Sequence, residues 1–143
     1  MDLSCLPIEI VRKICLFIPT INKNLLKEIR CSYIIRKIEK MYYNYWVILF
    51  SSDRNNMYDW LENDIMFWMN EEKGTLIKIT DKLKHFLNKT FKVKINNYQD
   101  LEIWDIQFRK LYPSTKLGWN VYSSNCSEKD INEFYIWTKN IIH

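Results

Sequence analysis

The sequence predicts an α+β protein that is mainly helical, with an N-terminal three-helix module followed by a small mixed α/β unit. Apolar residues recur at spacings of three and four over the first fifty positions, and alternation with a period of two begins at Phe91. A helix-capping sequence follows at Ser127. We expect the α/β unit to contain a short β hairpin or meander and a C-terminal helix. The two regions, 1–50 and 51–143, either fold separately or pack as one domain.

Three short helices are expected in the first region. Pro7 suits an initial helical turn, where its missing N–H costs nothing, and it predicts a helix over residues 7–18. Asn22 or Asn24 can cap a second helix. A third is expected over about 32–49, where apolar residues continue at helical spacing.

Two further helices are expected before the strands. Asp53 is a plausible helix cap, and the apolar residues from there to Met69 closely match a period of 3.6 residues. Gly74 should stop this helix. A second amphipathic run covers about 75–89.

The predicted strands depend on alternation. Residues 91–95 alternate strictly, 96–97 form a possible tight turn, and residues 104–109 alternate again, which together suggest a hairpin. Residues 117–122 are a possible third strand. The second strand has a helical alternative, because helical spacing is also satisfied by Leu101, Trp104, Phe108 and Leu111.

Catalysis is not expected from this composition. With two Gly in the chain, no glycine-rich phosphate loop is possible, and the sequence contains no nucleophile motif. His85 is the one interior histidine and is explained as a partly exposed helix residue. The carboxylates Asp59, Glu62 and Asp64 should lie on the solvent face of a helix, where their pKa values would not be pushed apart. We therefore predict no catalytic residue and no enzyme activity.

Metal, cofactor and membrane sites are also not expected. The four cysteines form no CxxC pair, so neither a metal site nor a cofactor is predicted. The longest apolar run, Tyr45 to Phe50, is far shorter than the roughly 20 residues of a membrane-spanning helix. The first residues lack the basic start of a secretory signal. We expect an intracellular protein, cytoplasmic or nuclear.

The residue usage indicates the kind of genome that encodes the chain. The sequence has no alanine but contains 20 Ile, 16 Lys and 14 Asn. These abundant residues have A/T-rich codons, which favours an A/T-rich genome such as that of a large DNA virus or a protist.

The N-terminal region resembles an F-box over residues 4–46. The family opens with L-P-x-E-[LI]-x-x-x-I-x-x-[YF]-[LI] and continues with a Leu pair. The positions that match are Leu6, Pro7, Glu9, Ile10, Ile14, Phe17 and Ile18, with Leu25 and Leu26 near the expected second helix. Two positions depart from the family. Arg30 stands where the family normally has an apolar residue, and Ile34 stands where it favours Trp or Phe.

The resemblance implies a non-catalytic adaptor. An F-box docks on the Skp subunit of a cullin-RING ubiquitin ligase, and those nine matching residues would form the partner-binding site. Residues 51–143 would then hold a protein target of unknown identity. Short viral proteins of this type are similar to adaptors that redirect the host's ligase, so a host–virus interaction is implied.

Two other functions remain open. The same helices can be ordinary core in a structural or virion-type interaction protein. A lysine-rich segment over 73–94 is a weak candidate for nucleic-acid binding, through Lys78, Lys82, Lys89, Lys92 and Lys94. The acidic residues of 51–72 lie beside that segment and weaken this case, so nucleic acid is an unlikely partner. We expect no membrane partner.

Overall fold

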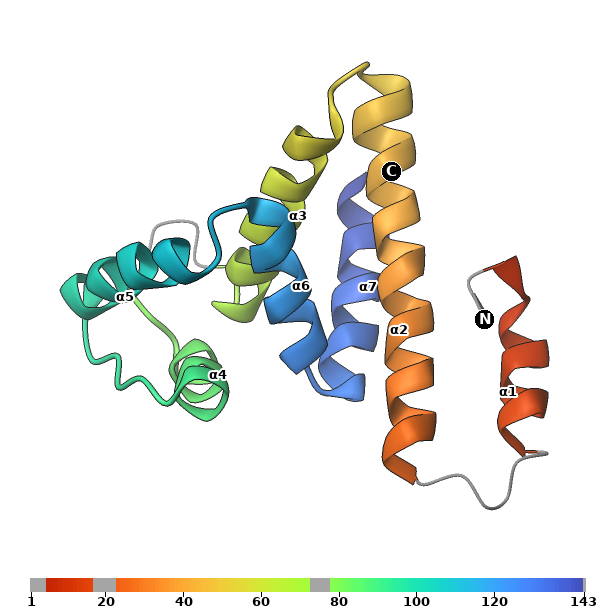
Figure 1. The fold of residues 1–143 in the computed structure, drawn as a ribbon, viewed down its shortest axis with the longest axis horizontal. Coiled ribbons are helices and arrows are strands. Elements are labelled where there is room, and N and C mark those ends of the chain that lie inside the picture. Colours follow the sequence, from red (N-terminus) through yellow and green to blue (C-terminus); the bar gives the residue numbers. More distant parts are fainter. Residues whose placement is uncertain (1–4, 17–22, 73–77, 143) are drawn as a thin grey trace.

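The computed structural model describes residues 5–16, 23–72 and 78–142, and all regular structure in these ranges is helical. In chain order the elements are α1 (Ile8–Leu16), α2 (Lys23–Tyr42), the π-helix η2 (Tyr43–Leu49), α3 (Arg54–Met69), α4 (Asp81–Phe91), α5 (Tyr98–Leu111), α6 (Thr115–Asn125) and α7 (Glu128–Ile142). Figure 1 shows α1 at one end of the molecule, α2 with α7 next to it, then α3 with α6, and α4 with α5 at the other end.

The α+β prediction is wrong, because the predicted first strand is the end of a helix and a linker. Phe91 is the last residue of α4, and Lys92 closes that helix in the left-handed conformation with φ of 58°. Val93 is half-buried and Ile95 is buried, while Lys94 between them is exposed. The alternation therefore comes from an extended linker with one side on the core, not from a paired strand.

The predicted second strand is the helix α5, the alternative that the spacing also allowed. The Asn97 side chain accepts a hydrogen bond from the backbone N–H of Asp100 at 2.9 Å, so this residue caps a helix instead of forming a hairpin turn. Trp104 and Phe108 are buried, whereas Ile106 is 60% exposed. A strand would have placed all three on the same face, and the burial matches helical spacing instead.

The predicted third strand is also helical. Ser114 Oγ accepts a hydrogen bond from the N–H of Leu117 at 3.3 Å and caps α6. Trp119 and Tyr122, three residues apart, are both buried. The apolar residues of this segment thus follow the helical period. A run of six residues is too short to distinguish that period from strand alternation.

The N-terminal module is not made of three short helices. The first expected helix is present as α1, but the second and third are one continuous helix, α2, extended by η2. No Pro or Gly interrupts residues 23–49, so nothing in the sequence forces a break there. Ile34, Ile38 and Tyr42 are buried at spacings of four and hold α2 on the core.

Two helix starts are confirmed. Asp53 Oδ1 accepts a hydrogen bond from the N–H of Asn56 at 2.9 Å at the start of α3. Ser127 Oγ accepts one from the N–H of Asp130 at 3.1 Å at the start of α7. Capping side chains accept hydrogen bonds from N–H groups that have no partner within the helix. Because few residue types can do this, the start of a helix can be predicted from the sequence.

One core cluster joins both halves of the chain. It contains Tyr42 and Ile38 of α2, Leu61 of α3, Trp119 of α6 and Phe134 of α7, each with no exposed surface. The main packed pairs are α2 with α7 and α3 with α6. The region 1–50 is therefore packed against 51–143 through α2.

A buried amide brings together two separated parts of the chain near α4. Asn70 is fully buried, and its Oδ1 accepts a hydrogen bond from the N–H of Thr80 at 2.8 Å. Its Nδ2 donates to the carbonyl of Lys78 at 3.2 Å. The end of α3 and the start of α4 are thereby fixed relative to each other.

Candidate partner-binding surface

Helix α1 lies antiparallel to the first half of α2 and is held there by a small number of contacts (Figure 1). Val11 faces inward and is 1% exposed. The hydroxyl of Tyr33 donates a hydrogen bond to the carbonyl of Leu6 at 2.9 Å. The Pro7 carbonyl accepts from the N–H of Ile10 at 3.0 Å and so begins the helix. These contacts fix which side of α1 faces outward.

Several apolar side chains at this end of the molecule are on the outside. Pro7 is exposed, Ile10 is 44% exposed, Leu16 is 80% exposed and Leu25 at the start of α2 is 45% exposed. Among the side chains of this 9-residue helix that the structure describes, Val11 alone is buried, so little of their apolar surface is used for the core. We call this set, Pro7, Ile10, Leu16 and Leu25, the α1 surface.

The residues predicted to bind a partner divide between exposed and half-buried positions. Glu9 is exposed along with Pro7, Ile10 and Leu25, whereas half-buried positions are taken by Leu6, Ile14 and Leu26. Phe17 and Ile18 lie outside the described residues. The sequence pattern did not distinguish Val11, which the structure buries most completely, because Val11 is not part of the repeating motif.

The two departures from the F-box pattern have structural roles. Arg30 forms an ion pair with Glu128, with Nε to Oε1 at 2.6 Å, and this pair joins α2 to α7. Ile34 is 8% exposed and contributes to the core. Arg30 therefore holds α2 on α7, and Ile34 belongs to the core.

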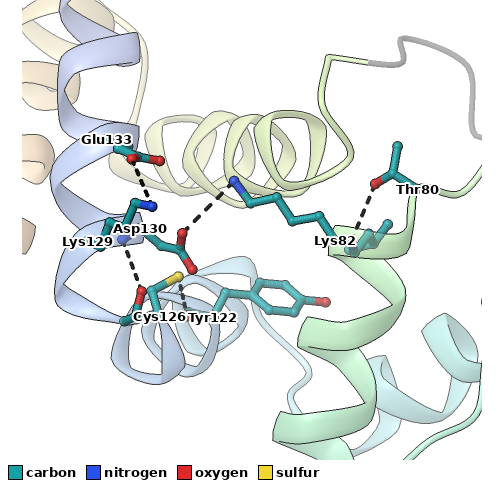
Figure 2. A network of polar contacts seen from close by, with 9 residues as sticks. Thr80, Lys82, Tyr122, Cys126, Lys129, Asp130 and Glu133 are labelled. Carbon is teal, nitrogen blue, oxygen red and sulfur yellow. Dashed lines mark hydrogen bonds and ion pairs between the residues drawn. The ribbon is translucent and has the colours of Figure 1, made fainter.

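The lysines predicted to bind nucleic acid do not form one uniform set. Lys78, Lys89, Lys92 and Lys94 are exposed. Lys82 is half-buried and reaches from α4 toward α7, with Nζ 4.0 Å from Oδ1 of Asp130 (Figure 2). Its Nζ also lies 3.8 Å from the centroid of the Trp68 ring, a cation–π contact. Lys82 thus connects helices of the core.

The same region contains a buried thiol. Cys126 Sγ donates a hydrogen bond to the carbonyl of Tyr122 at 3.3 Å, as Figure 2 shows. Burial, and secondarily the carboxylate of Asp130, raise the pKa of Cys126 to about 12. A thiol with so high a pKa is a poor nucleophile near neutral pH, which favours a structural role.

The buried ionisable groups were not foreseen from sequence. Glu62 is 8% exposed and pairs with Arg109 of α5, although a solvent-facing position was expected. Asp64 accepts a hydrogen bond from the hydroxyl of Tyr42 at 2.6 Å. Burial is the main cause that raises the pKa of both carboxyls. The helical period that placed Glu62 among polar neighbours carries no information about Arg109, 47 residues away.

In the part of the chain that the structure describes, no three His, Cys, Asp or Glu side chains are grouped as metal ligands. None of the helices described has the unbroken apolar length that a bilayer crossing requires. Comparisons with known protein families, with curated proteins and with solved structures return no match for this chain.

Proposed function

We propose that this protein is a non-catalytic adaptor that docks on the Skp subunit of a cullin-RING ubiquitin ligase through the α1 surface. The observation that carries the proposal is the F-box-like series that starts at Leu6 and Pro7, several of whose members lie outside the core. Pro7, Ile10 and Leu25 belong to that series and are exposed. The remainder of the chain then presents a protein target to the ligase.

The physical argument concerns what a short helix does with its apolar residues. An isolated helix of nine residues is too short to be stable in water, so α1 depends on α2 for its structure. That docking uses Val11 and the Tyr33 hydrogen bond and leaves Ile10 and Leu25 partly in water. Burying such side chains fully is worth about 1.5–3 kcal/mol each, reduced here because they are already half covered. A partner groove supplies that burial.

A direct binding measurement tests the proposal. Full-length protein is titrated into purified Skp by calorimetry, and wild type is compared with Ile10→Asp. The matched control is Ile103→Asp, because Ile103 is also an exposed isoleucine on a helix, at 57% exposure, but belongs to α5. We expect Ile10→Asp to weaken binding at least about tenfold, which corresponds to about 1.4 kcal/mol, and Ile103→Asp to leave it unchanged.

Two outcomes contradict the adaptor function. Absence of binding between the wild-type chain and Skp does so directly. An equal loss with Ile10→Asp and Ile103→Asp also does so, because it assigns the interaction to general surface hydrophobicity. Circular dichroism on each variant verifies that the helices are retained. The same preparation with the cullin subunit added shows whether the chain joins the larger ligase through Skp.

A further inference from the structure

A second surface, distinct from the α1 surface, combines apolar and basic residues. A groove of about 720 Å³ lies between the end of α2, the π-helix η2 and the last turns of α7. Met41, Tyr45, Ile48 and Leu49 line it from α2 and η2, and Ile142 lines it from α7. We call this the η2 groove.

The groove lies where η2 continues α2 beside the end of α7. The continuous helical stretch of α2 and η2 runs from Lys23 to Leu49, and among the described residues it extends past Ile142, the last described residue of α7 (Figure 1). Ile48 is consequently 62% exposed and Leu49 68% exposed. The described residues of α7 therefore leave both of these large apolar side chains mostly in water.

The π-helix η2 both packs on α3 and lines the groove. Trp46 stacks on Trp60 of α3, with ring centroids 4.6 Å apart and planes 5° apart. This contact holds η2 against α3, while Tyr45, whose ring meets that of Trp46 edge-on at 5.2 Å, and Ile48 line the groove. π-Helical turns are rare and frequently lie at functional sites, which supports a binding role for this one.

The charge of the η2 groove is of one sign. Among the described residues, Lys37, Lys40 and Lys139 line it and no Asp or Glu side chain does. Within the described part of the chain, none of these three lysines lies within ion-pair distance of a carboxylate. Lys139 Nζ lies instead 4.4 Å from the Tyr135 ring centroid, and Lys37 Nζ 5.3 Å from that of Tyr33. The ligand that complements the groove is therefore acidic and partly apolar.

We propose that the η2 groove binds an acidic amphipathic helix of a partner protein. The lining from Lys37 to Leu49 spans 13 residues, at most roughly 18 Å at the α-helical rise of 1.5 Å per residue, which matches about three turns of a bound helix. The partner's apolar face packs on Tyr45 and Ile48, and its carboxylates face the lysines. This is the helix-in-groove mode of recognition.

Two other occupants are separated from a helical peptide by different means. A membrane surface offers anionic groups to the same lysines, so the vesicle experiment described below distinguishes it from a peptide. A second copy of the same face, related by a two-fold axis, would set its lysines against lysines. The proposal does not depend on the adaptor function, because it uses residues that are not part of the α1 surface.

The test uses two synthetic helical peptides and the full-length protein. Both peptides are fluorescein-labelled and 16 residues long, with Leu at alternating spacings of three and four. One has Glu at the flanking positions and the other has Lys at the same positions. Fluorescence anisotropy measures the affinity of each. We expect the Glu peptide to bind at least about tenfold more tightly than the Lys peptide, with an affinity that falls as salt rises.

Charge reversal makes the test specific to the groove. In the triple variant Lys37→Glu/Lys40→Glu/Lys139→Glu, we expect the preference to invert, so that the Lys peptide binds more tightly. The matched control is Lys84→Glu/Lys89→Glu/Lys94→Glu, which changes the net charge equally but lies in and just after α4. The control should preserve the preference for the Glu peptide. Inversion in the groove variant but not in the control, which has the same net charge, assigns the preference to the groove.

Four results overturn the proposal. The first is absence of binding to the Glu peptide, and the second is equal binding of the two peptides by the wild type. In the third, the wild-type protein binds phosphatidylcholine–phosphatidylserine vesicles, the groove variant does not, and neither peptide binds. This result would identify the occupant as a membrane. Retention of the wild-type preference in the groove variant also contradicts the assigned site.

Discussion

Glu62 of α3 and Gly118 of α6 are in direct contact, because the carboxylate oxygen Oε2 of Glu62 occupies the position where a side chain on residue 118 would begin. The other oxygen of Glu62 pairs with Arg109. Oε2 itself is buried and makes no hydrogen bond among the described residues. The glycine thus gives the carboxylate its space, and the close packing of α3 with α6 depends on both residues.

The first prediction concerns Gly118→Ala. In an ordinary helix interior this change is favourable by about 1 kcal/mol, because Gly has more backbone freedom to lose. Here the new methyl group would displace the Glu62 carboxylate and strain its pair with Arg109, so we expect a net loss of roughly 1–3 kcal/mol. Urea denaturation measures it. In a Glu62→Ala background the same change should be neutral or stabilising, and an equal loss in both backgrounds would contradict the clash.

A second prediction follows from Arg109. Replacement by Met keeps much of the side-chain volume but leaves Glu62 buried without its cationic partner. Because Arg109 is about one-third exposed, water relieves part of the penalty, and we expect a destabilisation of about 1–3 kcal/mol at pH 7. The double variant Arg109→Met/Glu62→Gln should recover part of the loss. A double variant less stable than Arg109→Met alone would show that the charge of Glu62 is not the cause.

Asp64 gives a prediction about pH. Burial raises its pKa above 3.8, and the hydrogen bond from Tyr42 opposes that rise. A carboxyl with a raised folded-state pKa binds more protons folded than unfolded, so it costs stability as pH rises from the unfolded value to the raised one. Asp64→Asn removes this cost and keeps an acceptor for Tyr42. Its stability relative to wild type should therefore increase between about pH 3.8 and neutrality. Denaturation curves giving a constant difference across this range would refute it.

Thiol alkylation tests the burial of Cys126. Its pKa is raised to about 12, whereas Cys5 is exposed. At pH 8 iodoacetamide should modify Cys5 in the native protein and leave Cys126 unmodified, as read by peptide mass spectrometry. In denaturant both should react. Rapid native modification of Cys126 would mean that the junction of α6 and α7 opens readily.

Tyr33→Phe examines how firmly α1 is attached. The change deletes the hydroxyl that donates to the Leu6 carbonyl and should cost about 0.5–1.5 kcal/mol. Because the bond holds the start of α1, the loss should appear as faster amide hydrogen exchange in α1, with little change in α3 or α6. Uniformly faster exchange throughout the chain would instead assign the bond to global stability.

Local signals in the sequence were enough to place several helix boundaries. Asp53 and Ser127 cap their helices through side chains close in sequence, and such interactions can be read from a few residues. The alternation after Phe91 was also real, but a one-sided linker and a half-buried strand produce the same pattern. Pairing with a second strand is a non-local property, and single-sequence periodicity does not contain it.

The candidate site was predictable only in part. The F-box-like spacing identified the helix, but it did not distinguish Val11, which packs inward, from Ile10, which lies outward. That division depends on where α2 lies. The η2 groove was not foreseen, because its lysines come from α2 and α7, which lie about ninety residues apart in sequence. Counting charge along segments of the sequence does not reveal a basic surface whose lysines come together only when the helices pack.

The two hydrogen bonds of Asn70 have a practical consequence. They fix the carbonyl of Lys78 and the N–H of Thr80 to the end of α3, so the core does not rely on the length of chain that connects these points. A single side chain therefore sets where α4 begins relative to the end of α3, and a substitution at residue 70 would affect both helices at once.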